Sequence, residues 1–228
     1  MTYCVAVRLE AGMIFASDSR TNAGVDQVAT FSKMRVYEKP DDRVIVALTS
    51  GNLAMTQGVV NLLDRQARAP EGARTIWSVD SMYDAAQIVG GALREMRRRD
   101  AAFLEASHIE VHSDLIVGGQ IGAEPPRLFH VYSEGNFIEA TEETPYFQLG
   151  ESKYGKPILD RVLSPALPQK EAAKCVLVSF DSTMKSNISV GLQHRIREGD
   201  PYFTMLRSRW AGGLRRVFTE LPDPDWLD

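Results

Sequence analysis

The chain has 228 residues, of which 44% are apolar and 25% charged, and its formal net charge at pH 7 is −4. This is the composition of an ordinary globular protein, and the acidic balance excludes a general nucleic-acid binder, which needs a basic face. No apolar run approaches the roughly 20 residues that span a bilayer, and no secretory signal is visible at the start. We therefore expect one domain over residues 1–228, without membrane contact and with a mobile acidic tail at 222–228.

Cysteine and histidine usage indicates neither a disulfide framework nor a metal site. The two cysteines, Cys4 and Cys175, fit a reducing cytosol, which predicts a cytoplasmic protein. The four histidines are scattered without the spacing of a metal site, and structural or surface roles are expected for all of them: His108, His112, His130 and His194. We expect no metal and no cofactor.

The first half of the chain is predicted as paired strands followed by two helices. The predicted strands cover residues 3–9, 13–17, 33–37 and 43–48. Thr49–Asn52 then opens a helix, and a second helix begins at Ser81, where Asp84 resembles the second residue of a capping box. Gly90 and Gly91 inside this second helix cost about 1 kcal/mol each relative to alanine, so we expect another backbone to approach closely there.

The second half is predicted to add three strands, two helices, two strands and a last helix. The predicted strands cover residues 109–120, 127–133, 137–149, 187–197 and 202–209, and the predicted helices cover 150–163, a segment from Pro168, and 211–219. Strands and helices come in separate runs instead of alternating. This order favours an α+β fold with sheets stacked between helix layers over a doubly wound fold.

The opening residues, MTYCVAVRLEAGMIFASDSR, contain a candidate nucleophile at Thr2. If Met1 stays, Thr2 is an ordinary strand residue. If Met1 is removed, Thr2 carries a hydroxyl and a free α-amine that can act as its base. An α-amine titrates near 7.7–8.0, so roughly a tenth of it is neutral at pH 7. Cys4 is the other candidate nucleophile, but a buried strand cysteine is the better interpretation.

Three further residues fit the chemistry of an N-terminal nucleophile. Lys33 starts a strand, and its ammonium group would depress the pKa of a nearby amine. Asp18 ends the second strand, where antiparallel pairing brings it close to residue 2 and lets it hold that lysine. Gly51 lies at a strand-to-helix turn and can offer its backbone N–H to an oxyanion. Taken singly, each residue also has an ordinary structural explanation: a turn cap, an exposed lysine or a loop glycine.

Together these motifs resemble those of a proteasome-type β subunit, one of the N-terminal nucleophile hydrolases. The segments MTYCVAVRLEAGMIFASDSRTNAGVD, FSKMR, LGESKYGKPILDR and DSTMKSNISVG are similar to the bacterial Anbu family of ancestral β subunits, and the resemblance extends over the whole chain. It implies an αββα four-layer sandwich and identical subunits assembled into a ring or open spiral. It also implies Thr2 as nucleophile, Lys33 and Asp18 as its supporting pair, and Gly51 as oxyanion donor.

The resemblance implies supporting residues as well, and here the chain departs from the proteasome pattern. Glu151 follows Gly150 where the proteasome has serine, which leaves Ser152 as the candidate one residue on. Asp181 or Thr183 with Ser186 would fill the last supporting positions. Residues that set cleavage preference are expected around Arg20, Thr21, Phe31 and Thr49.

Three functions remain open at this stage. The first is a threonine amidohydrolase that cleaves peptide or other amide bonds through an acyl-enzyme. The second is a catalytically silent scaffold subunit, which has no need for Thr2, Asp18 and Lys33 together. The third is an amidase or isopeptidase in a pathway with ATP-grasp and transglutaminase-like partners, as the resemblance implies.

Overall fold

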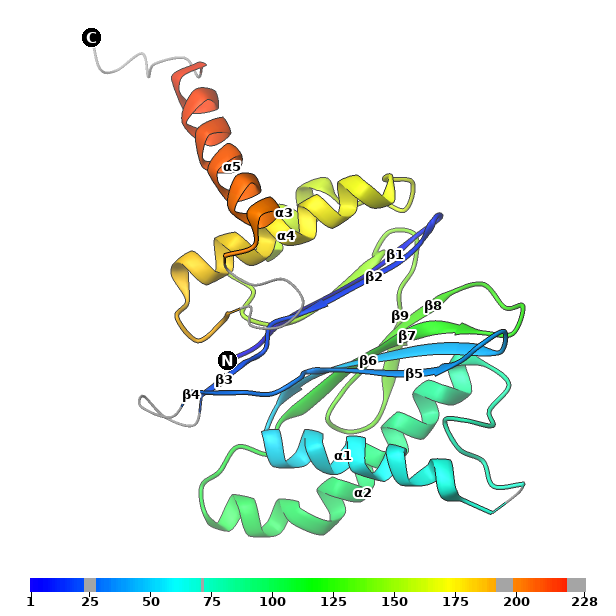
Figure 1. Cartoon of the computed structure of the whole chain (residues 1–228). Helices are drawn as coiled ribbons and strands as arrows, with labels where there is room; N and C mark the ends of the chain where they lie inside the picture. The colour runs from blue at the N-terminus through cyan, green and yellow to red at the C-terminus, as the bar shows by residue number, and fades with distance from the viewer. Residues whose placement is uncertain (23–27, 71, 192–198, 221–228) are drawn as a thin grey trace.

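The predicted α+β fold is confirmed as a sandwich of two β-sheets between two helical layers (Figure 1). The computed structural model describes residues 1–22, 28–70, 72–191 and 199–220. The predicted tail at 222–228 lies outside these residues. Within them, no helix combines the length and the apolar character that a bilayer crossing requires, and no three His, Cys, Asp or Glu side chains are grouped for a metal ion.

The smaller sheet has three antiparallel strands in the order β10-β1-β2. Their bounds are β1 Tyr3–Leu9, β2 Gly12–Ser17 and β10 Tyr146–Gly150. Because β1 is the central strand and both of its faces are covered, its residues Tyr3 to Val7 are fully buried. The predicted opening hairpin is therefore correct, with Cys4 opposite Ser17.

The larger sheet has five antiparallel strands in the order β5-β6-β7-β8-β9. Their bounds are β5 Met34–Lys39, β6 Arg43–Gly51, β7 Ser113–Ile121, β8 Arg127–Val131 and β9 Phe137–Glu139. A separate two-stranded ribbon is formed by β3 Arg20–Asn22 and β4 Val28–Thr30, between the predicted strands 13–17 and 33–37, where no strand was predicted.

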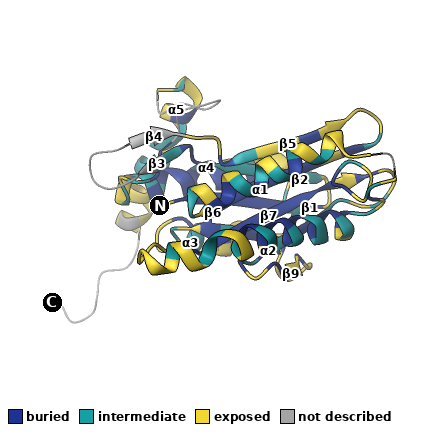
Figure 2. Ribbon diagram, turned by 90° about the horizontal axis from the view of Figure 1, so that it is seen from below, coloured by how far each residue is buried: buried dark blue, intermediate teal, exposed yellow. Residues whose placement is uncertain are grey.

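Helices cover the outer face of each sheet. The larger sheet carries α1 Leu53–Arg65, the short 3-10 helix Gln66–Arg68 and α2 Met82–Ala106; the smaller sheet carries α3 Lys156–Val162 and α4 Gln169–Ser186. Figure 2 shows the buried inner and exposed outer faces of α1 and α2. The last helix, α5 Pro201–Glu220, starts beside α4 and extends away from the sandwich (Figure 1).

The layers enclose three hydrophobic cores. One core fills the space between α1, α2 and the larger sheet, and another lies between the smaller sheet and α3 and α4. The third lies between the two sheets and includes Cys4, Leu48, Ile116 and Phe147. The predicted close approach in α2 is confirmed at Gly90, where a Cβ would lie 2.2 Å from a backbone oxygen of Gly135. At Gly91 it is wrong, because nothing lies within 4 Å of the corresponding position.

Two predictions of strands were wrong. Tyr202–Arg209 belongs to α5, because the Asp200 side chain accepts the N–H of Phe203 at 2.9 Å and Pro201 starts the helix. Residues 187–191 contain no strand, and 192–198 lie outside the described residues.

The segment 137–149 was predicted as one strand but divides between the two sheets. β9 pairs with β8 in the larger sheet, and β10 pairs with β1 in the smaller one. The start of β7 was also predicted four residues too early, since Ile109–His112 precede the strand.

Candidate active site

Thr2 lies just before β1 and is held there by the backbone of the neighbouring strand. Its carbonyl oxygen accepts the N–H of Glu151 at 2.9 Å, and its exposed fraction is 8%. Gly150 has φ +88°, and a Cβ there would lie 1.8 Å from the Thr2 oxygen. Only glycine fits this approach, so the end of β10 fixes the position of Thr2.

Asp18 directly follows β2 and is bound to the start of β1. Its N–H donates to the Tyr3 carbonyl at 2.9 Å, and its Oδ1 accepts the Tyr3 N–H at 3.0 Å. The carboxylate is fully buried. Hairpin pairing therefore places residue 18 next to residue 2, for the reason that the sequence indicated.

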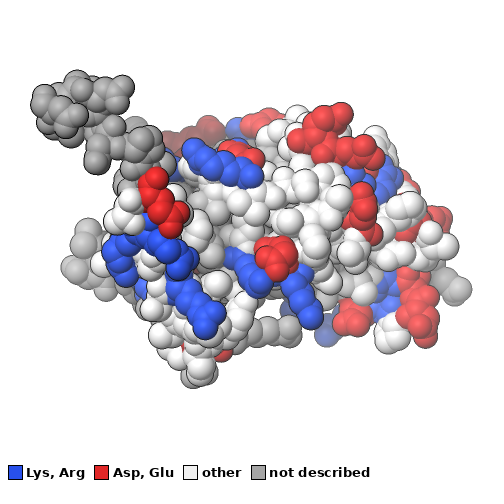
Figure 3. All heavy atoms as spheres, turned by 90° about the horizontal axis from the view of Figure 1, so that it is seen from above, with Lys and Arg blue, Asp and Glu red and all other residues white. Residues whose placement is uncertain are grey.

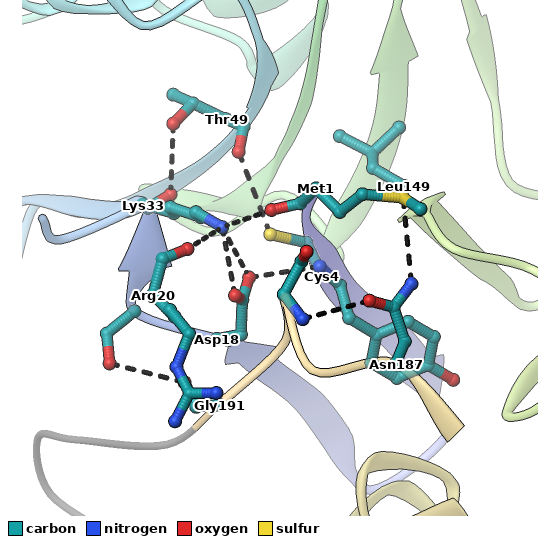
Figure 4. Close-up of polar contacts among 12 residues, drawn as sticks. Met1, Cys4, Asp18, Arg20, Lys33, Thr49, Leu149, Asn187 and Gly191 are labelled. Atoms are coloured by element: carbon teal, nitrogen blue, oxygen red, sulfur yellow. Dashed lines mark hydrogen bonds and ion pairs between the residues drawn. The ribbon is translucent and has the colours of Figure 1, made fainter. Parts of the chain in front are cut away.

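Lys33 points from the start of β5 into the same place (Figure 4). Its Nζ donates to both oxygens of Asp18 at 2.8 and 2.9 Å, to the Arg20 carbonyl at 2.8 Å and to the Met1 carbonyl at 3.1 Å. Burial raises the pKa of Asp18, and the Lys33 ammonium opposes that rise. The structure thus brings a buried ion pair against the peptide bond that joins Met1 to Thr2.

The same cation affects the chain terminus. The pKa of the Met1 α-amine is lowered, first by burial and then by the charge of Lys33, while Asp18 works in the opposite direction. An amine at this end of β1 is therefore more easily neutral than an ordinary α-amine.

Cys4 lies on β1 but cannot compete as a nucleophile. Its side chain is fully buried, its Sγ lies 3.7 Å from the Thr49 carbonyl, and burial raises the pKa of the thiol. A thiol without a thiolate form near neutral pH is inert.

Gly51 ends β6 and precedes the N-cap of α1, Asn52. Its φ is +99°, and a Cβ would lie 2.2 Å from the His112 backbone oxygen. The strand-to-helix turn therefore needs glycine. β6 also passes the ion pair, since the Thr49 N–H donates to the Lys33 carbonyl at 2.9 Å.

The supporting candidates differ in burial and in their partners. Ser152 and Ser186 are exposed, one after β10 and one at the end of α4. Asp181 is buried in α4, with its Oδ1 2.5 Å from Nε of Arg207 in α5. Of the residues expected to set cleavage preference, Thr49 is 8% exposed and Phe31 38% exposed, and the side chain of Thr21 lies outside the described residues.

Sequence reasoning missed the segment after α4, which closes over the site. The amide of Asn187 donates to the Glu151 carboxylate at 3.0 Å and lies 3.6 Å from the Met1 sulfur. Arg20 donates to the Ile188 carbonyl at 2.5 Å, and the Ser19 N–H donates to the Gly191 carbonyl at 3.1 Å. Asn187 is the C-cap residue of α4 and has an extended backbone, and its polar side chain at the end of a predicted helix was the available signal.

Solved structures with the same fold cover nearly the whole chain. Anbu, an ancestral β-subunit, from Yersinia bercovieri is 48% identical with a TM-score of 0.91, covering 98% of this chain and 99% of that one. The chain belongs to the Anbu family. Anbu from Hyphomicrobium sp. strain MC1 is 44% identical with a TM-score of 0.90, over 98% of this chain and 100% of that one.

A third Anbu structure adds information on assembly. The Anbu complex from Pseudomonas aeruginosa, which forms a helical assembly, is 45% identical with a TM-score of 0.93 over 100% of both chains. No protein-family model and no curated protein matches the chain. Anbu membership makes the αββα sandwich described above the N-terminal nucleophile hydrolase fold of proteasome-like β subunits.

Proposed function

We propose that this Anbu subunit is a threonine-type hydrolase of peptide or other amide bonds, with Thr2 as nucleophile once Met1 is lost. The observation that carries the proposal is the position of Lys33. Its side chain is 7% exposed, and its ammonium group is bonded to both oxygens of Asp18 and lies 3.1 Å from the Met1 carbonyl. This cation stands at the peptide bond whose cleavage creates the Thr2 amine.

The pKa of that amine is the basis of the chemistry. Burial and Lys33 already lower the pKa of the Met1 amine. An amine on Thr2 occupies the nitrogen that follows the Met1 carbonyl, so the same cation acts on it and raises its neutral fraction at pH 7. Asp18 holds the lysine in place through both of its carboxylate oxygens.

The proposed reaction needs no cofactor. The neutral amine of Thr2 takes the proton of its own hydroxyl, and Oγ1 attacks the substrate carbonyl. The N–H of Gly51 stabilises the oxyanion, and the proton then passes to the leaving amine. Water hydrolyses the resulting ester and regenerates the threonine.

The supporting residues lie in two segments, one after β10 and one at the end of α4. The hydrogen bond between Asn187 and Glu151 links these segments. We assign Ser152 to the first segment and Ser186 to the second, as residues that position the amine. Asp181 acts indirectly, because its ion pair with Arg207 anchors α5 beside α4.

The subunit is proposed to work as a cytoplasmic homo-oligomer, a ring or an open spiral. The helical assembly of the Pseudomonas aeruginosa relative supports this, at 45% identity over the full length. The Anbu resemblance supports a pathway with ATP-grasp and transglutaminase-like partners, in which the substrate is a peptide or an amide.

One observation favours the alternative of a silent scaffold subunit. While Met1 is attached, the nitrogen of Thr2 is an amide, and Lys33 is engaged by the Met1 carbonyl. A subunit that keeps Met1 can still assemble, but it lacks the free Thr2 amine that would act as the base.

Intact-mass measurement and a threonine-directed β-lactone distinguish the two functions. Protein produced in a bacterial cytosol is expected to lose Met1, because residue 2 is small, and then to gain the mass of one reagent molecule. Thr2→Ala, which also has a small second residue, should lose Met1 but gain nothing. Cys4→Ala should be labelled like the wild type, which excludes the thiol. A processed wild type that resists β-lactones and epoxyketones would establish the scaffold instead.

A further inference from the structure

A second group of polar side chains lies outside the candidate active site, where β7 begins and β8 ends. We call its four residues the β7–β8 polar cluster: His112, Asp114, His130 and Ser133. Asp114 accepts the Ser133 N–H at 3.0 Å through Oδ1, and its Oδ2 lies 3.1 Å from Nε2 of His130. Ser133 and Asp114 are buried. The reaction proposed above uses none of these four side chains.

Burial distinguishes this cluster from the charged groups on the surface. Figure 3 shows acidic and basic side chains interspersed over the outer face that carries α3 and α4. Exposed pairs, such as Lys156 with Asp160, contribute little to stability because water and salt screen them. A buried polar group must find its partners among its neighbours. The hydrogen bonds of the β7–β8 polar cluster therefore constrain where its backbone segments lie.

The hydroxyl of Ser133 holds the first residue of β7 through both of its backbone polar groups. Its Oγ accepts the Ser113 N–H at 2.8 Å and lies within donating distance, 2.9 Å, of the Ser113 carbonyl oxygen. The same Oγ lies 3.1 Å from Nδ1 of His112. A Ser–His–Asp set can indicate a nucleophile. This hydroxyl is 4% exposed and engaged by the backbone, so its role is to hold Ser113 in place.

The segment held by Ser133 is the one against which the Gly51 turn packs. Gly51 and Ser113 are partners in the register of β6 and β7, and the Asn52 N–H donates to the His112 carbonyl at 2.9 Å. The same carbonyl oxygen would lie 2.2 Å from a Cβ at Gly51. The direction of the Gly51 N–H therefore depends on the position of this backbone, which the Ser133 hydroxyl fixes.

The turn that carries Ser133 is itself attached to α2. It connects β8 with β9, and its Gly135 N–H donates to the Tyr132 carbonyl at 2.8 Å. Arg94 of α2 donates to the Gly135 carbonyl at 2.8 Å, and the backbone of Gly90 approaches the same residue closely. An oxyanion donor acts best when it is already in place before the charge develops. A support anchored in this way provides that rigidity.

We propose that Ser133 is a positioning residue: by holding the start of β7, its hydroxyl orients the Gly51 N–H toward the oxyanion that forms when Thr2 attacks. The inference rests on the hydrolase proposed above and adds a residue to it. Removing one oxyanion donor slows a reaction by about 100- to 1,000-fold, and displacing one causes part of that loss. We therefore expect Ser133→Ala to slow acylation of Thr2 by about tenfold or more.

The test follows acylation of the processed full-length protein by a β-lactone, using intact-mass measurement over time. The dependence of the rate on reagent concentration separates reagent binding from the acylation step. Ser133→Ala should keep the binding constant and lower the maximal rate, because only the acylation step forms an oxyanion. Ser133→Thr keeps the hydroxyl and should recover most of the rate. A threonine variant as slow as Ser133→Ala would count against the role of the hydroxyl.

Ser78→Ala is the matched control. The Ser78 hydroxyl also accepts a backbone N–H, that of Thr75 at 3.0 Å, and donates to a backbone carbonyl, that of Ala73 at 2.7 Å. It lies near the opposite end of β6 from Gly51, where Arg43 donates to the carbonyls before α2. Its removal should lower thermal stability without changing either acylation constant.

Amide hydrogen exchange adds a readout that does not depend on activity. The Asn52 N–H should exchange faster in Ser133→Ala and at the wild-type rate in Ser78→Ala. A processed wild type that no β-lactone labels would overturn the hydrolase and this role of Ser133 together. A labelled wild type with an equally fast Ser133→Ala variant would overturn the role of Ser133 alone. Slow acylation with unchanged exchange at Asn52 would overturn it as well.

Discussion

Replacing Lys33 by methionine tests whether its buried ion pair holds the candidate site together. Lys33 is 7% exposed and Asp18 is fully buried, with Nζ 2.8 and 2.9 Å from the two carboxylate oxygens. Methionine keeps much of the side-chain length, so the change removes a charge without opening a large cavity. Breaking a buried pair costs about 3–5 kcal/mol, because the remaining charge stays buried. Since the Tyr3 N–H still donates to Asp18, we expect a loss near about 3 kcal/mol in the free energy of unfolding.

The loss should depend on pH in a defined direction. Burial raises the pKa of Asp18, and removal of Lys33 removes the charge that opposes this rise. A carboxyl with a raised folded pKa favours the fold at low pH, when it is protonated, and opposes it as pH rises through that pKa. The difference in the free energy of unfolding between wild type and Lys33→Met should therefore shrink as pH falls from 7.

Urea denaturation of wild type and Lys33→Met at pH 7 and at about pH 5 measures both effects. Lys39→Met is the control, because Lys39 is 64% exposed and its ion pair with Asp42 lies on the surface, so little change is expected. A loss under about 1 kcal/mol at pH 7, or one that is the same at both pH values, would refute the reasoning.

Two further predictions concern α2 and the start of β7. Gly91→Ala should stabilise the protein by about 1 kcal/mol, because a Cβ there meets nothing within 4 Å, whereas Gly90→Ala should destabilise it, since its Cβ would lie 2.2 Å from the Gly135 oxygen; equal thermal shifts in the two variants would contradict this. Burial acts to raise the pKa of Asp114, but its bond with His130 at 3.1 Å and nearby charge outweigh burial and lower it. A carboxyl with a lowered folded pKa contributes stability above its unfolded pKa of 3.8, and this stability is lost as pH falls below that value. The loss of unfolding free energy in Asp114→Asn, relative to wild type, should therefore shrink in acid titrations monitored by circular dichroism. A loss that stays constant with pH would argue against the bond.

The sequence by itself determined the parts of the protein that depend on local pattern. Alternation along 3–9 and a two-residue turn at Glu10-Ala11 specify the opening hairpin, and that hairpin alone brings Asp18 to the start of β1. Helical periodicity and a capping serine locate α2, and a glycine before Asn52 marks the turn into α1. Two strands that are adjacent in the sequence can pair through their connecting turn and their own residue pattern, without a distant partner.

Tertiary structure decided what depends on distant partners. No local pattern divides 137–149 between two sheets, because the choice is made by β1 and β8, which offer separate edges. Asn187 reaches Glu151 only because α4 ends beside β10. Residues 202–209 fit a strand as well as a helix when taken alone; the Asp200 cap and the buried Phe203 settle the helix. Period and turn residues specify an element, but where its faces are buried depends on surfaces that the chain forms only once it has folded.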